Sequence, residues 1–411
     1  MVMHTQSSFS SLPLFIISMS RWDGDISSAS LALAKVFSKT NPVYYIDYPY
    51  TLADVVRERK LPSVKMRMNA LLRGKNYLRT IPGQPYNLMA ATPKATLPGN
   101  SLPPGSLYNW ATHINNKIVT ELIERICREK QYGDFLFLNS FNPIYLQQVE
   151  KYLQPALSIY HSRDAIEEIS THGLYRENTC VRHYDMSMAT SLTLCKNISE
   201  RNNKNVHYFP NGGDISLFRT AIEKRLPKPI ELQGITTPII GYTGAICQRF
   251  NYDLLVEMSK KHADKTIVLV GPRRDKQYSS YNLDELPNVI FTGAKKIDEL
   301  PAFLQYFDCA ILPFVYSNLT AGIYPLKINE YLAAGCSVVS TAFSEDVKGF
   351  AKHIRLAESN ADFLNMIDSA IADQSEEKRK ERLDVASSNA WENRVKRFWE
   401  LAWNQYQIKN K

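Results

Sequence analysis

Short apolar runs of strand length alternate with helical patterns along the whole chain. In the first half, the runs predicted as strands cover 14–17, 43–46, 135–138, 157–160 and 206–209. Between them, apolar residues recur every three to four positions over 27–37 and 108–130, a spacing that predicts amphipathic helices. Strands that alternate with helices in this way are typical of a parallel sheet covered on both faces.

The pattern stops at a cluster of turn residues and then begins again. Pro210, Asn211, Gly212, Gly213 and Asp214 follow the last predicted strand of the first half, and this density of turn residues marks a domain boundary. Beyond them, predicted strands cover 239–244, 266–270, 289–292, 309–312 and 337–340, with helices over 253–261, 326–334 and 391–407. The chain is therefore predicted to be an α/β protein whose two doubly wound, Rossmann-like domains face each other across a cleft. Their expected limits are 1–210 and 211–390, with a closing helix in 391–411.

Composition narrows the class of protein without identifying it. The 411 residues, 44% hydrophobic and 22% charged, fit a globular protein of two or three domains and exclude wholesale disorder. The longest early apolar run, 12–17, is too short to cross a bilayer, and no Lys or Arg precedes it, so a secretory signal is not expected. The six cysteines show no metal-ligating or redox spacing, which favours the reducing cytoplasm.

Positive charge is concentrated in one segment. The formal net charge is +8, and between residues 57 and 79 eight basic residues stand against one acid, Glu58. The basic residues are Arg57, Arg59, Lys60, Lys65, Arg67, Arg73, Lys75 and Arg79. Interleaved apolar side chains favour docking on an anionic membrane surface, hence a peripheral place on the inner face of the cell membrane, or binding of an anionic acceptor. A solvated helix or loop is the plain alternative, and nucleic acid is disfavoured because no nucleic-acid-binding motif accompanies the segment.

Several stretches of the second half resemble a known family. They are 209–214 with Phe218; 286–293 with Glu299, Leu300, Asp308, Pro313 and Phe314; and 325–335 before 338–341. Together they resemble the C-terminal donor domain of GT-B glycosyltransferases, in particular glycosyltransferase family 4 and its polysaccharide and teichuronic-acid-type members. The ending 391–394 is similar to the family's closing helix, which crosses back onto the first domain. The likeness covers roughly 206 to the C-terminus, whereas the first half agrees only in layout.

The resemblance implies a nucleotide-sugar donor, UDP- or GDP-linked, that is bound by the second domain without a metal or other cofactor. Glu330 is the candidate for the ribose diol because a carboxylate accepts two hydrogen bonds; a surface Glu favoured by a helix dipole is the alternative. The diphosphate needs positive charge, and Arg249 is the candidate, against an exposed structural Arg. Lys327 lies on the same predicted helix face as Glu330, where it would neutralise charge on the leaving group.

Further positions are expected to line the donor. Gly244 and Gly271 end the first two strands of the second domain, and the base is expected near Lys296 and Ile297. Backbone amides of the loop Gly322, Ile323 and Tyr324, together with the helix N-terminus, are expected to bind phosphate or sugar hydroxyls.

The sequence departs from the family pattern at two positions. The fuller motif has two Glu eight positions apart, but Gly322 stands eight before Glu330, which leaves the identity of the sugar open. The Arg that usually follows the glycine of the first strand is Ala245 here, so more of the diphosphate charge falls to Arg249.

The first domain is expected to bring the acceptor to the cleft. Gly24 follows the first strand, and its lack of a side chain would let the backbone approach the donor sugar. Asp23 or Asp25 is expected either to face the donor at this position or to be a helix N-cap. His161 and Asp164 end another strand; Asp164 resembles a recurrent acidic position in related transferases, and His161 is either a catalytic or acceptor-binding residue or a structural one.

The leading hypothesis is a metal-independent, retaining glycosyltransferase that uses a nucleotide sugar and a carbohydrate or lipid-linked acceptor in cell-surface polysaccharide biosynthesis. A sugar-nucleotide epimerase on the same fold is a second reading. A catalytically degenerate scaffold that binds sugar nucleotide or glycan in an assembly complex is a third, favoured by Gly322 in place of Glu.

Overall fold

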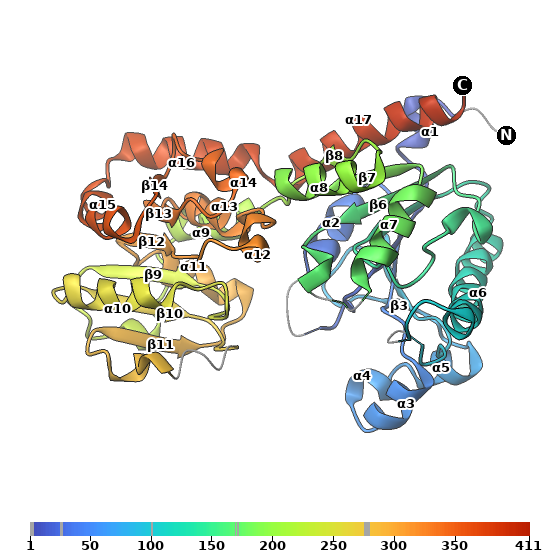
Figure 1. Cartoon of the computed structure of the whole chain (residues 1–411), viewed down its shortest axis with the longest axis horizontal. Coiled ribbons are helices and arrows are strands. Elements are labelled where there is room, and N and C mark those ends of the chain that lie inside the picture. Colours follow the sequence, from blue (N-terminus) through green and yellow to red (C-terminus); the bar gives the residue numbers. More distant parts are fainter. Residues whose placement is uncertain (1–3, 25–27, 100–101, 169, 171, 275–279) are drawn as a thin grey trace. The chain divides into compact units, whose positions relative to one another are not determined.

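The backbone forms two compact units. The computed structural model describes residues 4–24, 28–99, 102–168, 170, 172–274 and 280–411. Unit 1 holds Met1–Pro210 with Val395–Lys411, and unit 2 holds Asn211–Arg394 (Figure 1). The last helix, α17 (Trp391–Lys409), begins in unit 2 and ends in unit 1. The first boundary, between residues 210 and 211, and the start of the closing helix at residue 391 lie where the sequence predicts them. The second division between the units falls inside that helix, between residues 394 and 395.

Unit 1 is built on a sheet with the strand order β3-β4-β2-β1-β5-β6-β7-β8. The strands are β1 (Leu14–Ser18), β2 (Val43–Ile46), β3 (Leu78–Thr80), β4 (Leu88–Ala91), β5 (Leu136–Ser140), β6 (Leu157–Ser162), β7 (Met186–Ala189) and β8 (His207–Tyr208). Neighbouring strands are parallel except β3 and β4, which are antiparallel. The central strand β1 pairs with β2 and β5 and is buried throughout. This explains why its sequence is continuously apolar rather than alternating.

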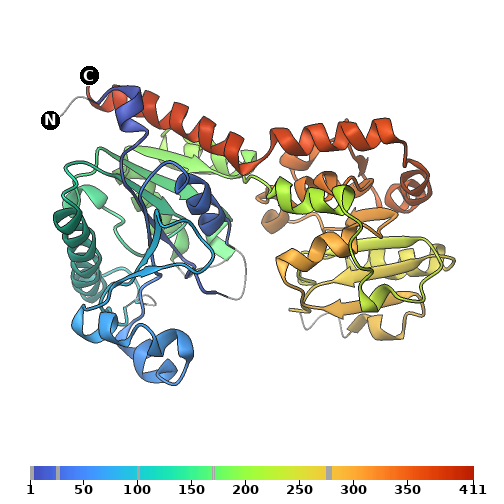
Figure 2. The same cartoon turned by 180° about the vertical axis from the view of Figure 1, so that it is seen from behind.

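Helices cover both faces of this sheet (Figure 2). They are α1 (Gln6–Phe9), α2 (Ala29–Phe37), α6 (Ser106–Lys130), α7 (Gly173–His183) and α8 (Leu192–Asn202). Phe15 shares one core cluster with Val119 and Ile123 of α6, in keeping with alternate residues of a strand facing opposite sides. The C-terminal part of α17 packs in unit 1, where Phe398 lies 4.7 Å from Phe37 between ring centroids.

Unit 2 has a parallel sheet in the order β11-β10-β9-β12-β13-β14. The strands are β9 (Ile239–Thr243), β10 (Thr266–Val270), β11 (Val289–Gly293), β12 (Cys309–Leu312), β13 (Val338–Thr341) and β14 (Arg355–Ala357). The helices are α9 (Ile215–Glu223), α10 (Tyr252–Lys261), α11 (Leu300–Leu304), α12 (Asn318–Ala321), α13 (Leu326–Ala333), α14 (Glu345–Lys348), α15 (Asn360–Ala372) and α16 (Glu376–Ser388). One apolar cluster joins the strands to α9, α10, α13 and α15. The carboxyl ends of the parallel strands therefore lie along one edge, where ligands bind in sheets of this kind.

The basic segment folds into three short helices after β2. They are α3 (Leu52–Glu58), α4 (Pro62–Lys65) and α5 (Met68–Arg73), which close over a small core of Tyr50, Val55, Val64 and Leu71. Thr51 caps α3 in a reciprocal pair with Asp54. We call these three helices the basic insert.

Arg67 departs from the predicted role of the basic segment. Its side chain is only 1% exposed, whereas six of the other seven basic residues are exposed and Arg79 is half-buried. The structure therefore removes Arg67 from any membrane or acceptor patch. The physical reason is that Asp23 and Asp47 hold its guanidinium inside unit 1.

The described part of the chain contains no helix that is both long and apolar enough to cross a membrane. All six cysteines are free thiols.

Candidate functional site

Two glycine turns shape the strand-end edge of unit 2. Gly244 directly follows β9, and a Cβ there would lie 2.3 Å from Cε of Lys327. Gly271 directly follows β10, and a Cβ there would lie 1.9 Å from the carbonyl oxygen of Gly244. At Gly271 the neighbouring atom is backbone, so only glycine fits there, and at Gly244 the φ of +141° favours glycine. The two turns and the Lys327 side chain therefore lie close together at the edge.

Lys327 and Glu330 lie on one face of α13, three residues apart. The helix follows Pro325 and ends before Gly335, whose φ of +75° is a left-handed stop. The Nζ of Lys327 is 3.8 Å from Oε2 of Glu330, and the two side chains are 27% and 10% exposed. The helix thus presents a cation and a carboxylate side by side next to the Gly244 turn.

Glu330 is a buried carboxylate with an unmet hydrogen-bond capacity. Its Oε2 is shielded from solvent and has no hydrogen-bond partner among the described residues. Burial raises the pKa of Glu330, the charge of Lys327 lowers it, and Asp214 raises it further. A buried carboxylate oxygen without a donor is unfavourable by itself, and a ligand with hydroxyl donors would satisfy it.

Neighbouring side chains belong to the same electrostatic environment. The Tyr331 hydroxyl accepts from the Thr243 amide at 2.9 Å and donates to the Thr243 carbonyl at 3.3 Å, and these bonds hold α13 against the end of β9. Burial raises the pKa of Tyr242, Tyr331 and Glu330 raise it further, and Arg249 lowers it. Arg249 is half-buried, and the structure records no ion pair for it within the described ranges. Its charge is therefore available to a ligand at this edge.

The loop before α13 differs from the expected amide cradle. The amides of Gly322 and Ile323 both donate to the carbonyl of Thr320, at the end of α12, so they are not open to phosphate. The Tyr324 hydroxyl is also engaged, accepting from Asn329 at 3.0 Å and from Arg394 at 3.3 Å. The expectation for this loop was wrong for the first two amides because the short helix α12 ends in a tight turn that uses them.

Lys296 and Ile297 lie where the base was expected, just after β11. Both are exposed, Ile297 by 40%, and the Lys296 amide donates to Glu299 at 2.7 Å. Their role at the base stays a prediction.

Sequence reasoning did not assign functions to Asp214 and Asn329. Asp214 caps α9 and adds to the field at Glu330, and Asn329 is fully buried and accepts from Asn389 at 3.0 Å. A Cβ at Gly213 would lie 3.2 Å from that of Asn329, and one at Gly212 would lie 2.7 Å from the Trp391 backbone. The turn motif 210–214 was the available signal, because its glycines admit close packing against α13 and the start of α17.

The predicted acceptor-side residues lie at the strand ends of unit 1. Gly24 is exposed, and its amide donates to the Arg21 carbonyl. Ser28 caps α2, so Asp23 is not its cap; Asp23 instead binds Arg67, and Asp25 lies outside the described residues. Asp164 is half-buried just after β6.

His161 is enclosed within unit 1. The residue is 1% exposed and its ring packs on Phe209 at 5.3 Å between centroids. Burial, and then the charge of Arg163, lower the pKa of His161 well below its ordinary value, so the ring is neutral at physiological pH. The structure gives it a packing role, while a part in catalysis stays a prediction.

Groups of three or more His, Cys, Asp or Glu side chains able to hold a metal ion are not found within the described ranges. The donor edge instead combines two cations, one carboxylate and two glycine turns.

Comparison with known proteins defines the class. Residues 237–373 match the family model for glycosyl transferases group 1, which covers most of unit 2. The chain has the GT-B fold, and residues 237–373 of unit 2 are similar to the group 1 glycosyl transferases.

Individual relatives are similar over different lengths. A curated relative from Bacillus subtilis, described as the teichuronic acid biosynthesis glycosyltransferase TuaH, is 29% identical over 191 residues. This match covers 45% of the chain and 48% of TuaH, so the alignment spans about half the length of that relative. A UDP-forming α,α-trehalose-phosphate synthase from Burkholderia vietnamiensis superposes with a TM-score of 0.67 at 12% identity, covering 98% of this chain and 99% of that one. Anabaena HepE, solved with UDP and glucose, gives 0.61 at 14% identity, covering 95% and 99%.

Proposed function

We propose that the chain is a metal-independent, retaining glycosyltransferase. It would transfer a sugar from a UDP- or GDP-linked donor to a carbohydrate or lipid-linked acceptor in cell-surface polysaccharide biosynthesis. The single observation that carries the donor half is the buried Oε2 of Glu330, which lies 3.8 Å from Nζ of Lys327 and has no hydrogen-bond partner among the described residues. The group 1 domain match, the TuaH relative and the UDP-bound structural neighbour support the same reading.

The donor edge would work through charge placement. The ribose hydroxyls donate to Glu330, which removes its unmet hydrogen-bond capacity. As the glycosidic bond to the diphosphate breaks, negative charge grows on the leaving phosphate oxygen. Lys327 lies against the Gly244 turn, where it would stabilise that charge, with Arg249 supplying the second cation.

The donor assignment is tested by thermal stabilisation against UDP, GDP, TDP, CMP and their sugars, with and without EDTA. A bound nucleotide at a hundredfold excess over Kd stabilises the fold by about 2.7 kcal/mol. We expect UDP or GDP to raise the melting temperature in EDTA. For Glu330→Gln at the same ligand concentration, we expect the stabilisation to fall to about 1.4 kcal/mol or less. Sugar transfer to an acceptor then separates transfer from epimerisation, which needs the donor alone.

A degenerate scaffold is the second candidate, favoured by one observation. Gly322 ends α12 where the family has its first Glu, so no carboxylate stands there to contact the donor sugar. Nucleotide binding without turnover across donors and acceptors would support the scaffold over the transferase.

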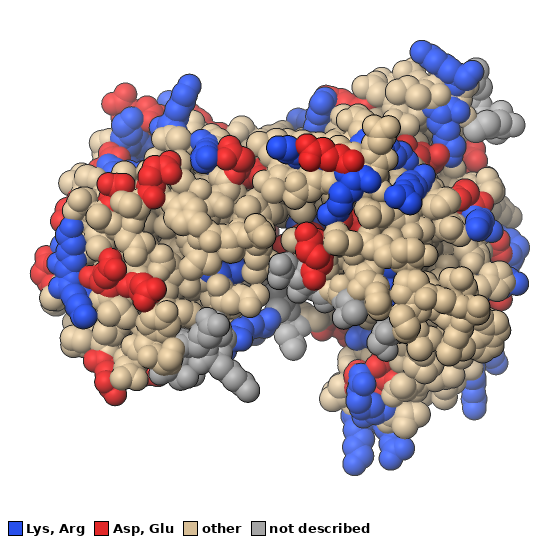
Figure 3. Space-filling view, in the orientation of Figure 1, with Lys and Arg blue, Asp and Glu red and all other residues tan. Residues whose placement is uncertain are grey.

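We further propose that the basic insert docks on an anionic membrane surface. Its outer side exposes apolar residues among the cations: Leu52 by 46%, Val56 by 65%, Leu61 by 48% and Leu72 by 58%. Figure 3 shows Lys and Arg gathered over the lobe that Figure 1 labels α3 to α5. Cations around exposed apolar side chains suit the interface of anionic lipid, and we place the protein peripherally on the inner face of the cell membrane.

Vesicle sedimentation tests this surface. We expect binding to vesicles with anionic lipid, weakening with salt, and reduced binding for Lys60→Gln with Lys65→Gln. Equal binding to neutral vesicles would reject the docking proposal and leave the donor assignment untouched.

A further inference from the structure

A hollow lies in unit 2 at the edge of the sheet opposite the donor residues. It has a volume of about 280 Å³ and is lined by Lys352, His353, Ile354, Arg355, Asp373, Lys378, Glu381 and Arg382. Arg355 is the first residue of β14, whereas Gly244 and Gly271 follow the last residues of their strands. Because the strands are parallel, this hollow belongs to the amino-terminal edge and is not part of the donor site.

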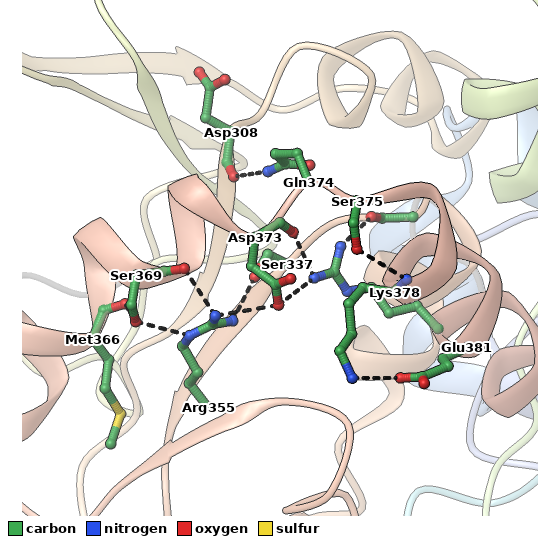
Figure 4. A network of polar contacts seen from close by, with 12 residues as sticks. Asp308, Ser337, Arg355, Met366, Ser369, Asp373, Gln374, Ser375, Lys378 and Glu381 are labelled. Carbon is green, nitrogen blue, oxygen red and sulfur yellow. Dashed lines mark hydrogen bonds and ion pairs between the residues drawn. The ribbon is translucent and has the colours of Figure 1, made fainter.

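Two arginines meet a single carboxylate oxygen in this hollow (Figure 4). Oδ2 of Asp373 accepts from Arg355 at 3.2 Å and from Arg382 at 3.0 Å. Arg355 also donates to Ser337 and Ser369, and Arg382 to the carbonyls of Gly335 and Asp373. These hydrogen bonds fix both guanidinium groups in place, but the single negative charge of Asp373 is shared between the two positive charges.

The rim adds more positive charge than it neutralises. Lys352 and Lys378 are exposed, and among the described residues Lys378 pairs with exposed Glu381, one helical turn away, at 3.0 Å. The structure records no ion pair for Lys352 or His353 within the described ranges. The lining thus holds four permanent positive charges against two carboxylates. An exposed pair of the Lys378 kind contributes little, so it exchanges readily for a better anion.

A purely structural reading explains only part of this arrangement. The Arg355–Asp373–Arg382 contacts fasten β14, the end of α15 and α16 together, and this needs neither Lys352 nor an open volume. Burial lowers the pKa of Arg382, Asp373 raises it and Arg355 lowers it. In the lining as a whole, two carboxylates face four permanent positive charges, so an excess of positive charge is left. An added anion would complete the charge balance.

We propose that this hollow is a binding site for a small phosphate-bearing anion. Most N–H groups of Arg355 and Arg382 already donate within the protein, so the exposed ammonium groups of Lys352 and Lys378 would bind the phosphate oxygens. The two guanidinium groups add fixed positive charge beside them. The volume lies below the range of about 300–1,000 Å³ typical of drug-sized ligand pockets, so the ligand is no larger than a sugar phosphate. Inorganic phosphate and a sugar phosphate share this chemistry and are separated by the test.

The test measures the melting temperature and binding heat of the full chain with inorganic phosphate and with glucose 6-phosphate. Chloride at matched ionic strength is the reference. We expect a phosphate-dependent rise in melting temperature for the unaltered chain. The variant Lys352→Gln with Lys378→Gln should raise the half-saturating concentration at least about tenfold. Lys380→Gln, an exposed lysine of the same helix outside the lining, is the matched control and should behave like the unaltered chain.

Two outcomes would overturn the proposal. The first is no stabilisation beyond chloride by either anion, and the second is stabilisation that the double variant keeps in full. Because the donor edge can also take phosphate, the titration is repeated with Arg249→Gln and Lys327→Gln together. Stabilisation that persists in that background belongs to the hollow even if the donor assignment fails. A preference for glucose 6-phosphate over phosphate would identify the larger ligand.

Discussion

Each unit contains a buried charged side chain, Arg67 in unit 1 and Glu330 in unit 2, and the two differ in how many of their hydrogen bonds are satisfied. Arg67 of unit 1 has five N–H donors, and all five are used by Asp23, Asp47 and the Ser63 carbonyl at 2.7–3.2 Å. Glu330 of unit 2 is also buried, yet its Oε2 meets no donor among the described residues. Removing a partner from a buried charge whose hydrogen bonds are complete destabilises the fold, whereas a buried carboxylate oxygen without a donor is a candidate for contact with a ligand.

The fixed position of Arg67 extends to the loop after β1. Arg67 joins α5 and the basic insert to Asp23 in that loop, and Asp47 is held in turn by Thr92 at 2.6 Å. Arg21 of the same loop lies 3.4 Å over the Tyr50 ring. Arg67 therefore holds the loop that carries Gly24.

Replacing Arg67 by Met should give the largest effect. It leaves Asp23 and Asp47 buried without their partner, and breaking a buried pair in this way costs roughly 3–5 kcal/mol. Calorimetry should show unit 1 melting at a much lower temperature, while the stabilisation by UDP or GDP, which reports on unit 2, persists. The melting temperature of Arg67→Lys should lie between those of the unaltered chain and Arg67→Met, because an ammonium has three donors instead of five. Melting of Arg67→Met within a degree or two of the unaltered chain would show that the network is not structural.

Replacing Glu330 by Gln should separate stability from binding. Ionising a group whose folded pKa is raised costs stability at every pH above its unfolded value, so a neutral Gln removes that cost. We expect the variant to be as stable at pH 7 as the unaltered chain, or more so. Its affinity for the nucleotide should fall roughly ten- to a hundredfold, because a hydrogen bond to a charged group contributes about 1.5–3 kcal/mol. A destabilised variant with normal affinity would make Glu330 a structural residue like Arg67.

The pH dependence of nucleotide binding tests whether the ionised form of Glu330 binds the ligand. The carboxylate form of Glu330 accepts the ribose hydroxyls, and its pKa lies above the usual value of about 4.3. As the solution is acidified, the affinity for the nucleotide should therefore begin to fall at a higher pH than it would if Glu330 had an ordinary pKa. The ligand itself also takes up protons, so the slope is compared with that of Glu330→Gln, which should lack the Glu330 contribution. Parallel slopes in the two proteins would contradict the assignment.

The sequence predicted the fold better than the site because the two depend on different information. Strands such as β1 and β9 are buried on both faces, and their continuous apolar runs made them visible. The carboxylates that bury Arg67 lie 20 and 44 residues away along the chain, so nothing near Arg67 distinguished it from its exposed neighbours. Lys327 and Glu330 were predictable as one helix face, but the burial of Glu330 depends on the packing of that helix against β9. Strand β14 was missed because it has three residues and begins with a charged one.

Lys65, two positions before Arg67, should give the smallest effect on stability and so isolates what burial does. Both residues lie in the same basic run, but Lys65 is exposed and Arg67 is not. An exposed charge without a buried partner contributes within about 0.5 kcal/mol, so Lys65→Gln should leave the denaturation midpoint almost unchanged. If vesicle binding then falls while stability does not, Lys65 acts on a surface and Arg67 acts inside the fold. A large loss of stability would mean that the insert depends on its surface charges as well, and that burial alone does not separate the two residues.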